Sequence, residues 1–158
     1  MENQNVEIFT DGSCHTQRRI GTWVAIIFNG TERKLLTGIM EDTTHNQMEL
    51  IAVINAIEYA KLHYQNIPTI RVYTDSQYVI MIPGRKKKME LAGFNTKKGS
   101  ALQNTDLVKK LLDLVSSVPV EFIKIIAHQK KTDTNNYNRE ADMLSRKLLR
   151  KVIGETLT

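Results

Sequence analysis

The sequence predicts an α/β fold: a five-stranded mixed sheet, with three antiparallel strands first and two parallel strands after them, flanked by helices. Three apolar, β-branched stretches follow one another through short turns at the start of the chain, which is typical of an antiparallel meander. Later apolar stretches alternate with segments of helical periodicity, which is typical of parallel strands joined by helices. The length of 158 residues suits one domain, so we expect residues 1–158 to form a single unit.

The first three strands are expected at residues 6–10, 22–28 and 34–40. The turn signal Asp11-Gly12 is predicted to end the first strand, and Asn29-Gly30 to join the second strand to the third. Short connections of this kind join neighbouring antiparallel strands, so the three segments are predicted to form a meander.

Apolar residues then recur at helical spacing from residue 46 onward. Pro68 separates the first helix from a strand at 69–74, and Pro119 opens the last strand, at 119–127. The helix after residue 75 is expected to end before Pro83. The predicted helices span residues 46–63, from 75 or 76 to 82, 86–92, 105–115 and 138–152.

Composition indicates the class of protein and its cellular location. Hydrophobic residues make up 41% and charged residues 25%, values typical of soluble globular chains. The longest clean apolar run, 24–28, is too short to cross a bilayer, and the N-terminus lacks a signal-peptide pattern. Cys14 is the single cysteine and cannot form an internal disulfide. We therefore expect a cytoplasmic monomer without a membrane partner.

The net charge of +5 is unevenly distributed. Between residues 84 and 98, six basic side chains stand against one acidic residue, Glu90. Local clustering of this kind favours a polyanionic partner, although a solvated surface loop has the same composition. We call residues 84–100 the basic handle.

Four acidic residues, each in a short motif, are the main candidates for chemistry: Asp11, Glu49, Asp75 and Asp142. Each has an ordinary explanation alone, such as a turn for Asp11, a helix N-cap for Asp75, or a first-turn acid for Asp142. Brought together by a fold, they need a compensating cation, and oxygen ligands suit Mg²⁺ or Mn²⁺. In a basic protein this combination indicates phosphodiester chemistry.

Glu49 is the acid that a structural role explains least. Its neighbours at i+3, i+4 and i+7 are Ala52, Val53 and Ala56, a small apolar face suited to packing on a sheet. A carboxylate at the end of that face requires a partner, and no Lys or Arg stands at helical spacing to supply one. His128, after the last strand, is either a surface residue or a proton shuttle.

The ordered motifs resemble those of a known family. Thr10-Asp11-Gly12-Ser13-Cys14 is followed by Asn46-Gln47-Met48-Glu49-Leu50, then by Thr74-Asp75-Ser76-Gln77-Tyr78-Val79, and finally by His128 and Asn138-Arg139-Glu140-Ala141-Asp142. The set resembles ribonuclease H type 1 of bacteria over residues 6–149. The resemblance implies the ribonuclease H-like fold and a hydrolase that cuts the RNA strand of RNA–DNA hybrids. It also implies a two-metal-ion mechanism with Mg²⁺, or Mn²⁺ as a substitute, that leaves 5′-phosphate and 3′-hydroxyl ends.

The same resemblance implies residue roles. Asp11, Glu49, Asp75 and Asp142 match the metal-binding carboxylates, and His128 matches a histidine that assists proton transfer or product release. The residues that match nucleic-acid contacts are Cys14, Thr44, His45, Asn46, Gln77, Lys86, Lys87, Lys88, Lys97 and Lys98. The chain also departs from the family's pattern, and its loop at residues 15–21 lacks the Asn-Pro-Gly-rich stretch of many relatives. His45 stands where Asn is more frequent, Ala127 stands where Gly is usual, and Phe94 is the only aromatic residue of the basic handle.

Three alternatives stay open from the sequence. The chain could be an integrase-like or exonuclease core, which also uses clustered acids, although usually with other spacing. It could be a hybrid-binding module without catalysis, although such a module is expected to lose at least one acid. It could also be the ribonuclease H portion of a reverse transcriptase.

Overall fold

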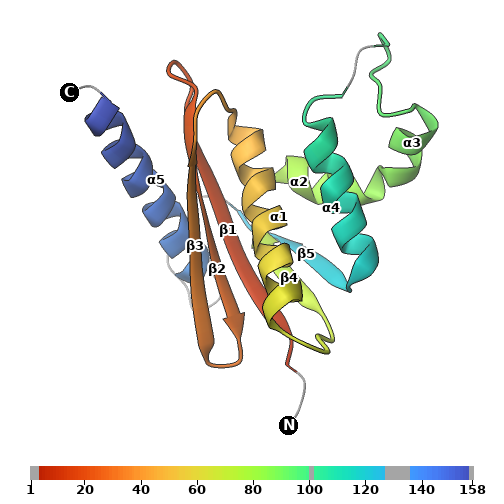
Figure 1. Ribbon diagram of the computed structural model, residues 1–158, viewed down its shortest axis with the longest axis horizontal. Coiled ribbons are helices and arrows are strands. Elements are labelled where there is room, and N and C mark those ends of the chain that lie inside the picture. The colour runs from red at the N-terminus through yellow and green to blue at the C-terminus, as the bar shows by residue number, and fades with distance from the viewer. Residues whose placement is uncertain (1–3, 100–101, 127–135, 157–158) are drawn as a thin grey trace.

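One five-stranded sheet forms the centre of the computed structural model, which describes residues 4–99, 102–126 and 136–156 (Figure 1). The strands are β1 (Val6–His15), β2 (Ile20–Asn29), β3 (Glu32–Met40), β4 (Ile70–Thr74) and β5 (Val120–Lys124), in the spatial order β3-β2-β1-β4-β5. Strands β1, β2 and β3 pair antiparallel, whereas β4 pairs parallel with both β1 and β5. The predicted fold class is therefore confirmed.

Helices cover both faces of the sheet. They are α1 (His45–His63), α2 (Gln77–Gly84), α3 (Lys86–Leu91), α4 (Thr105–Ser117) and α5 (Asn136–Thr156). Helices α1 and α4 lie on one side of the sheet and α5 lies on the other (Figure 1). Because β1 and β2 are covered on both faces, seven of the ten residues of each strand are buried, without the alternation of a half-exposed strand. The main core lies under α1, and a smaller cluster (Phe9, Val24, Ile26 and Ala141) lies under α5.

The start of α1 is fixed by a side-chain cap. Thr44 adopts an extended backbone, and its hydroxyl accepts a hydrogen bond from the backbone N–H of Gln47 at 3.1 Å. This cap satisfies one of the donors that a helix N-terminus leaves unpaired. The helix then buries residues from Met48 to Ala60 against the sheet, so Glu49 begins the buried run together with Met48.

Three expectations about element ends were wrong. The first strand does not end at Asp11-Gly12, because β1 continues to His15 by pairing with β2 as far as Ile20. Helix α2 includes Pro83 and ends at Gly84, since a proline in the last turn removes few helical hydrogen bonds. Strand β5 ends at Lys124, before the expected end at 127, and residue 127 lies outside the described residues.

The parallel pairing between β1 and β4 covers only the first part of β1. The register with β4 stops at Phe9 and Tyr73, whereas β1 continues to His15. One side of β1 is therefore left without a strand partner beyond this point. Among the described residues, no helix combines the length and apolar character needed to cross a bilayer.

Candidate active site

Asp11 lies on the part of β1 that extends beyond β4. Side chains alternate between the two faces of a strand, so Asp11 shares the α5 face with Phe9 and Ser13, and Gly12 faces α1. A Cβ on Gly12 would lie only 2.9 Å from the Glu49 backbone nitrogen and 2.9 Å from Met48 Cβ. The absence of a side chain at Gly12 lets α1 approach β1 and brings Glu49 toward Asp11.

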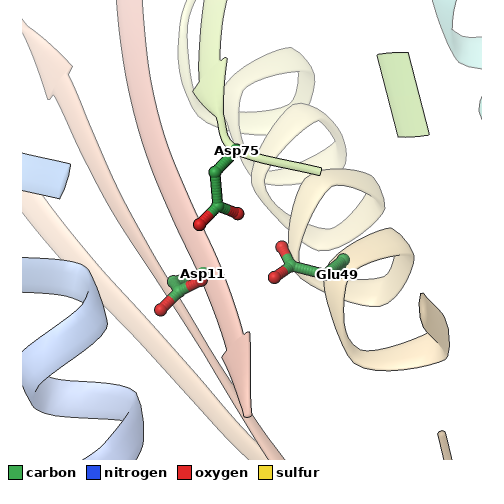
Figure 2. Close-up of side chains that lie close together, drawn as sticks. All are labelled: Asp11, Glu49 and Asp75. Atoms are coloured by element: carbon green, nitrogen blue, oxygen red, sulfur yellow. The ribbon is translucent and has the colours of Figure 1, made fainter. Parts of the chain in front are cut away.

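Glu49 is fully buried, and its carboxylate points toward Asp11 and Asp75 (Figure 2). Neither of its oxygens has a well-formed hydrogen bond within the described part of the chain. His45, one helical turn earlier, places Nε2 3.3 Å from Glu49 Oε1, at ion-pair distance. This interaction with the Glu49 carboxylate raises the pKa of the His45 imidazole. One partly exposed imidazole leaves most of the hydrogen-bonding capacity of Glu49 unsatisfied.

Asp75 follows β4 directly. The Thr74 hydroxyl accepts from the Ser76 backbone N–H at 3.0 Å, and the Ser76 hydroxyl accepts from the Val79 N–H at 3.2 Å. Ser76 is therefore the N-cap of α2, so Asp75 does not have the capping role considered for it. The Asp75 carboxylate instead points toward Asp11 at the end of the parallel strands (Figure 2).

The three carboxylates meet in one place. Asp11, Glu49 and Asp75 each offer an oxygen, and these oxygens lie within 4.8 Å of one another. Burial, followed by repulsion from Glu49 and Asp75, raises the pKa of Asp11 to about 10. Burial, and then the charge of Asp75, also raises the pKa of Glu49, although His45 opposes the shift. Carboxyls so placed can all ionise at neutral pH only if a cation joins them, so this site fits a divalent metal ion.

Asp142 borders the same pocket from α5. It is close enough to Asp11 to contribute to the raised Asp11 pKa. It lies in the second turn of α5, so the first-turn dipole role considered for it does not apply. Arg146, one turn further along, donates from Nε to Asp142 Oδ1 at 2.9 Å and orients this carboxylate.

The pocket has a volume of about 620 Å³ and contains several of the predicted positions. Besides Asp11, Asp75 and Asp142, its lining includes Cys14, His45, Asn46 and Gln77. Thr44 does not line it and caps α1 instead. The predicted handle lysines are carried by α3 and by the segment that follows it. His128 lies outside the described residues.

Two residues near the site were missed from the sequence. Arg146 pairs with Asp142, and the Ser145 hydroxyl lies 3.2 Å from Asp11 Oδ2. For Arg146 the signal was helical spacing, because it stands four positions after Asp142 on a predicted helix. An Asp–Arg pair at that spacing could have been predicted, whereas the contact between Ser145 and β1 depends on tertiary packing.

Known proteins resemble this chain over most of its length. A family model described as RNase H matches residues 3–150. A ribonuclease H of Wolbachia sp. subsp. Drosophila simulans is 35% identical over 150 residues, which cover 94% of this chain and 98% of the relative. A ribonuclease H of Prosthecochloris aestuarii is 32% identical over 149 residues, which cover 93% and 97%.

Two solved structures resemble the fold. A type 1 RNase H with the type 2 active-site motif matches with a TM-score of 0.74 at 21% identity, over 93% of this chain and 72% of that chain. The foamy viral protease-reverse transcriptase in complex with dsDNA matches with a TM-score of 0.68 at 21% identity, over 90% and 92%. At such identity these structures support the fold alone.

Proposed function

The chain belongs to the ribonuclease H family, and we propose that it hydrolyses the RNA strand of RNA–DNA hybrids. We also propose that the reaction uses two Mg²⁺ ions and leaves 5′-phosphate and 3′-hydroxyl ends. The observation that carries the proposal is the meeting of Asp11, Glu49 and Asp75 in one pocket, with their oxygens within 4.8 Å of one another. Two of these carboxylates are buried, and none of the three pairs with a lysine or arginine in the part of the chain that the structure describes, so the set suits a hard divalent cation.

The donor set supports Mg²⁺, with Mn²⁺ as a substitute. All four candidate ligands offer carboxylate oxygens, which hard cations prefer. We assign Asp11 as the ligand shared by both ions, Glu49 and Asp75 to one ion, and Asp142 to the other. The chemistry such ions supply is activation of a water nucleophile and stabilisation of negative charge on the leaving 3′-oxygen.

The chain itself holds these carboxylates in place. The Ser76 cap fixes the turn that carries Asp75, and Arg146 orients Asp142. The close packing of α1 on Gly12 keeps Glu49 beside Asp11. Positioning of this kind lowers the barrier because the reacting groups need little reorganisation. His128 is proposed, on the family resemblance, to relay a proton near the leaving group.

Selectivity is proposed to come from backbone shape and the RNA 2′-hydroxyl. Cys14, His45, Asn46 and Gln77 surround the acids with groups able to contact sugars and phosphates. The basic handle is proposed to bind the DNA strand. Contacts to phosphates and sugars carry no base information, so we expect little sequence preference.

The direct test is a cleavage assay with four substrates: RNA–DNA hybrid, double-stranded RNA, double-stranded DNA and single strands, each with Mg²⁺ or with EDTA. We expect cleavage of the RNA strand of the hybrid alone, and only with Mg²⁺. Cutting of DNA duplexes would favour the integrase-like or exonuclease alternative. Hybrid binding without turnover would favour a non-catalytic binding module.

The handle gives a separate prediction. Replacing Lys86, Lys87 and Lys88 with Ala should raise KM for the hybrid several-fold and change kcat by less than about twofold, because phosphate contacts contribute to binding. The salt dependence of binding should weaken by about one unit of slope for each lysine that contacts a phosphate. Steady-state kinetics and binding titrations at several salt concentrations measure both effects.

A control variant replaces two lysines outside the handle, Lys34 and Lys61. Lys34 lies over the Tyr59 ring and Lys61 donates to Ser117, so both lie toward the C-terminal half of α1 and away from the pocket. Their replacement with Ala should leave KM within about twofold of the parent value, since non-contacting charges act only through the screened general field. The handle variant removes three positive charges and the control removes two, so changes in KM in that proportion would show that net charge, and not the handle, governs binding.

A further inference from the structure

A buried cluster of hydroxyl groups connects α5 to the sheet beneath Asp11. It consists of Ser13 on β1, Thr22 on β2 and Ser145 on α5, which are 8%, 0% and 0% exposed. Ser13 and Thr22 are directly paired across the two strands, and both face α5. Thr22 donates its hydroxyl to the backbone oxygen of Ser145 at 2.7 Å, which adds a contact between β2 and this turn of α5.

The Ser145 hydroxyl has three partners but only one proton to donate. Its oxygen lies 3.2 Å from Asp11 Oδ2, 2.9 Å from Ser13 Oγ and 3.1 Å from the Asp142 backbone oxygen. When a bound cation keeps Asp11 ionised, its carboxylate is the strongest acceptor among the three, because hydrogen bonds to charged groups are stronger than neutral ones. Ser145 then accepts from Ser13, which gives a chain of donation from Ser13 through Ser145 to Asp11.

The same residue links two acids that are far apart in the sequence. Asp142 stands one turn before Ser145 on α5, while Asp11 belongs to the first strand. A single buried side chain therefore contacts the carboxylate of one acid and the backbone of the other. Any shift of α5 along the sheet would break this contact and change the separation of the two carboxylates.

We propose that Ser145 is a positioning residue, whose hydroxyl holds the Asp11 carboxylate in one orientation and sets the distance between Asp11 and Asp142. The proposal rests on the function proposed above. With Ser145 donating to Oδ2, the Oδ1 oxygen and the remaining lone pairs of Asp11 are directed toward the pocket, where a divalent ion needs them. Ser145 itself does not touch the substrate.

The test compares Ser145→Ala with Thr22→Val in the full chain. Ser145→Ala should lower kcat by roughly 10- to 100-fold, because that factor corresponds to the free energy of one hydrogen bond to a charged group. It should leave KM for the hybrid within about twofold of the parent value. It should also raise about tenfold the Mg²⁺ concentration that gives half of the maximal rise in Tm. Thr22→Val removes a buried hydroxyl but keeps the bond to Asp11, so it should lower Tm in EDTA and leave the Mg²⁺ midpoint within about twofold.

A double-mutant cycle separates positioning from simple loss of stability. Ser13→Ala alone should shift the Mg²⁺ midpoint less than Ser145→Ala, and the double variant should shift it no further than Ser145→Ala alone, because both act on one carboxylate. Additive shifts, or a Ser145→Ala midpoint equal to the parent value, would overturn the proposal. If the parent chain itself shows no Mg²⁺-dependent cleavage, the proposed function fails instead, so the two failures are distinguishable.

Discussion

Replacing Asp11 with Asn is expected to lower hybrid cleavage by roughly 10³-fold or more, because a shared metal ligand contributes several kcal/mol to the transition state. The amide keeps the size of the side chain and can still accept from Ser145, so the fold should be retained. Hybrid binding measured in Ca²⁺ or EDTA should change little, since the basic handle is proposed to contribute most of it. Single-turnover cleavage and a binding titration measure the two quantities.

The same substitution should make the metal-free protein more stable at neutral and alkaline pH. Folding raises the Asp11 pKa from 3.8 to about 10, so the folded chain binds a proton that the unfolded chain releases. The contribution of Asp11 to stability is therefore present in full below about pH 4 and is lost as pH rises toward 10. In EDTA, the parent protein should lose up to about 1.4 kcal/mol of unfolding free energy per pH unit from this group over that range.

Asp11→Asn should remove most of this slope, and thermal denaturation at pH 5 to 9 in EDTA would show it. Glu49, whose pKa is raised by burial, and His45, whose pKa is raised by Glu49, add falls in the same direction above about pH 4.5 and pH 6.5, which Asp11→Asn should leave in place. Mg²⁺ should raise the Tm of the parent protein much more than that of the variant. Near-normal cleavage by Asp11→Asn, or an unchanged pH slope in EDTA, would contradict the assigned role of this residue.

The second large effect is expected from Gly12→Ala. The added Cβ would lie 2.9 Å from Met48 Cβ and from the Glu49 backbone nitrogen, so α1 must move away from β1. Overpacking of this kind costs about 1–3 kcal/mol, and a clash with backbone belongs at the upper end. For a chain of this length that lowers Tm by roughly 6–12 °C. Cleavage should fall as well, because the shift separates Glu49 from Asp11.

Gly154→Ala is the matched control for Gly12→Ala. Gly154 lies in α5, and a Cβ there meets no atom within 4 Å among the described residues. Alanine in an exposed helix is favoured over glycine by about 1 kcal/mol, so this variant should be slightly more stable and fully active. A Gly12→Ala protein with parental Tm and parental activity would show that the close approach of α1 and β1 is not required.

Periodicity predicted the elements of this chain well, and tertiary pairing decided where they end. The strand that carries Asp11 was expected to stop at Asp11-Gly12, because that dipeptide is a common turn signal. In the structure this dipeptide is strand, because residues 11–15 find antiparallel partners in β2. Local signals cannot report partners that arrive later in the chain, so the extension of β1 beyond β4 was not predictable.

In the candidate site, too, local patterns predicted some features and tertiary packing determined the others. Helical spacing around Glu49 indicated a buried carboxylate in need of a partner, and the structure places Glu49 fully buried beside Asp11 and Asp75. The catalytic and metal-binding roles of these residues stay predictions. Ser145 carries no local signal, since a serine in the middle of a helix is usually unremarkable. Its contact with Asp11 exists only because α5 packs across β1 and β2.

The dependence of the pocket on α5 has a consequence during synthesis. Residues 6–75 already contain Asp11, Glu49 and Asp75, whereas Asp142 and Ser145 are synthesised later. On the proposed roles, a nascent chain still attached to the ribosome has an incomplete metal site and cannot cut nucleic acid beside it. On the same roles, nuclease activity begins only after α5 has emerged and docked, so the order of translation delays it.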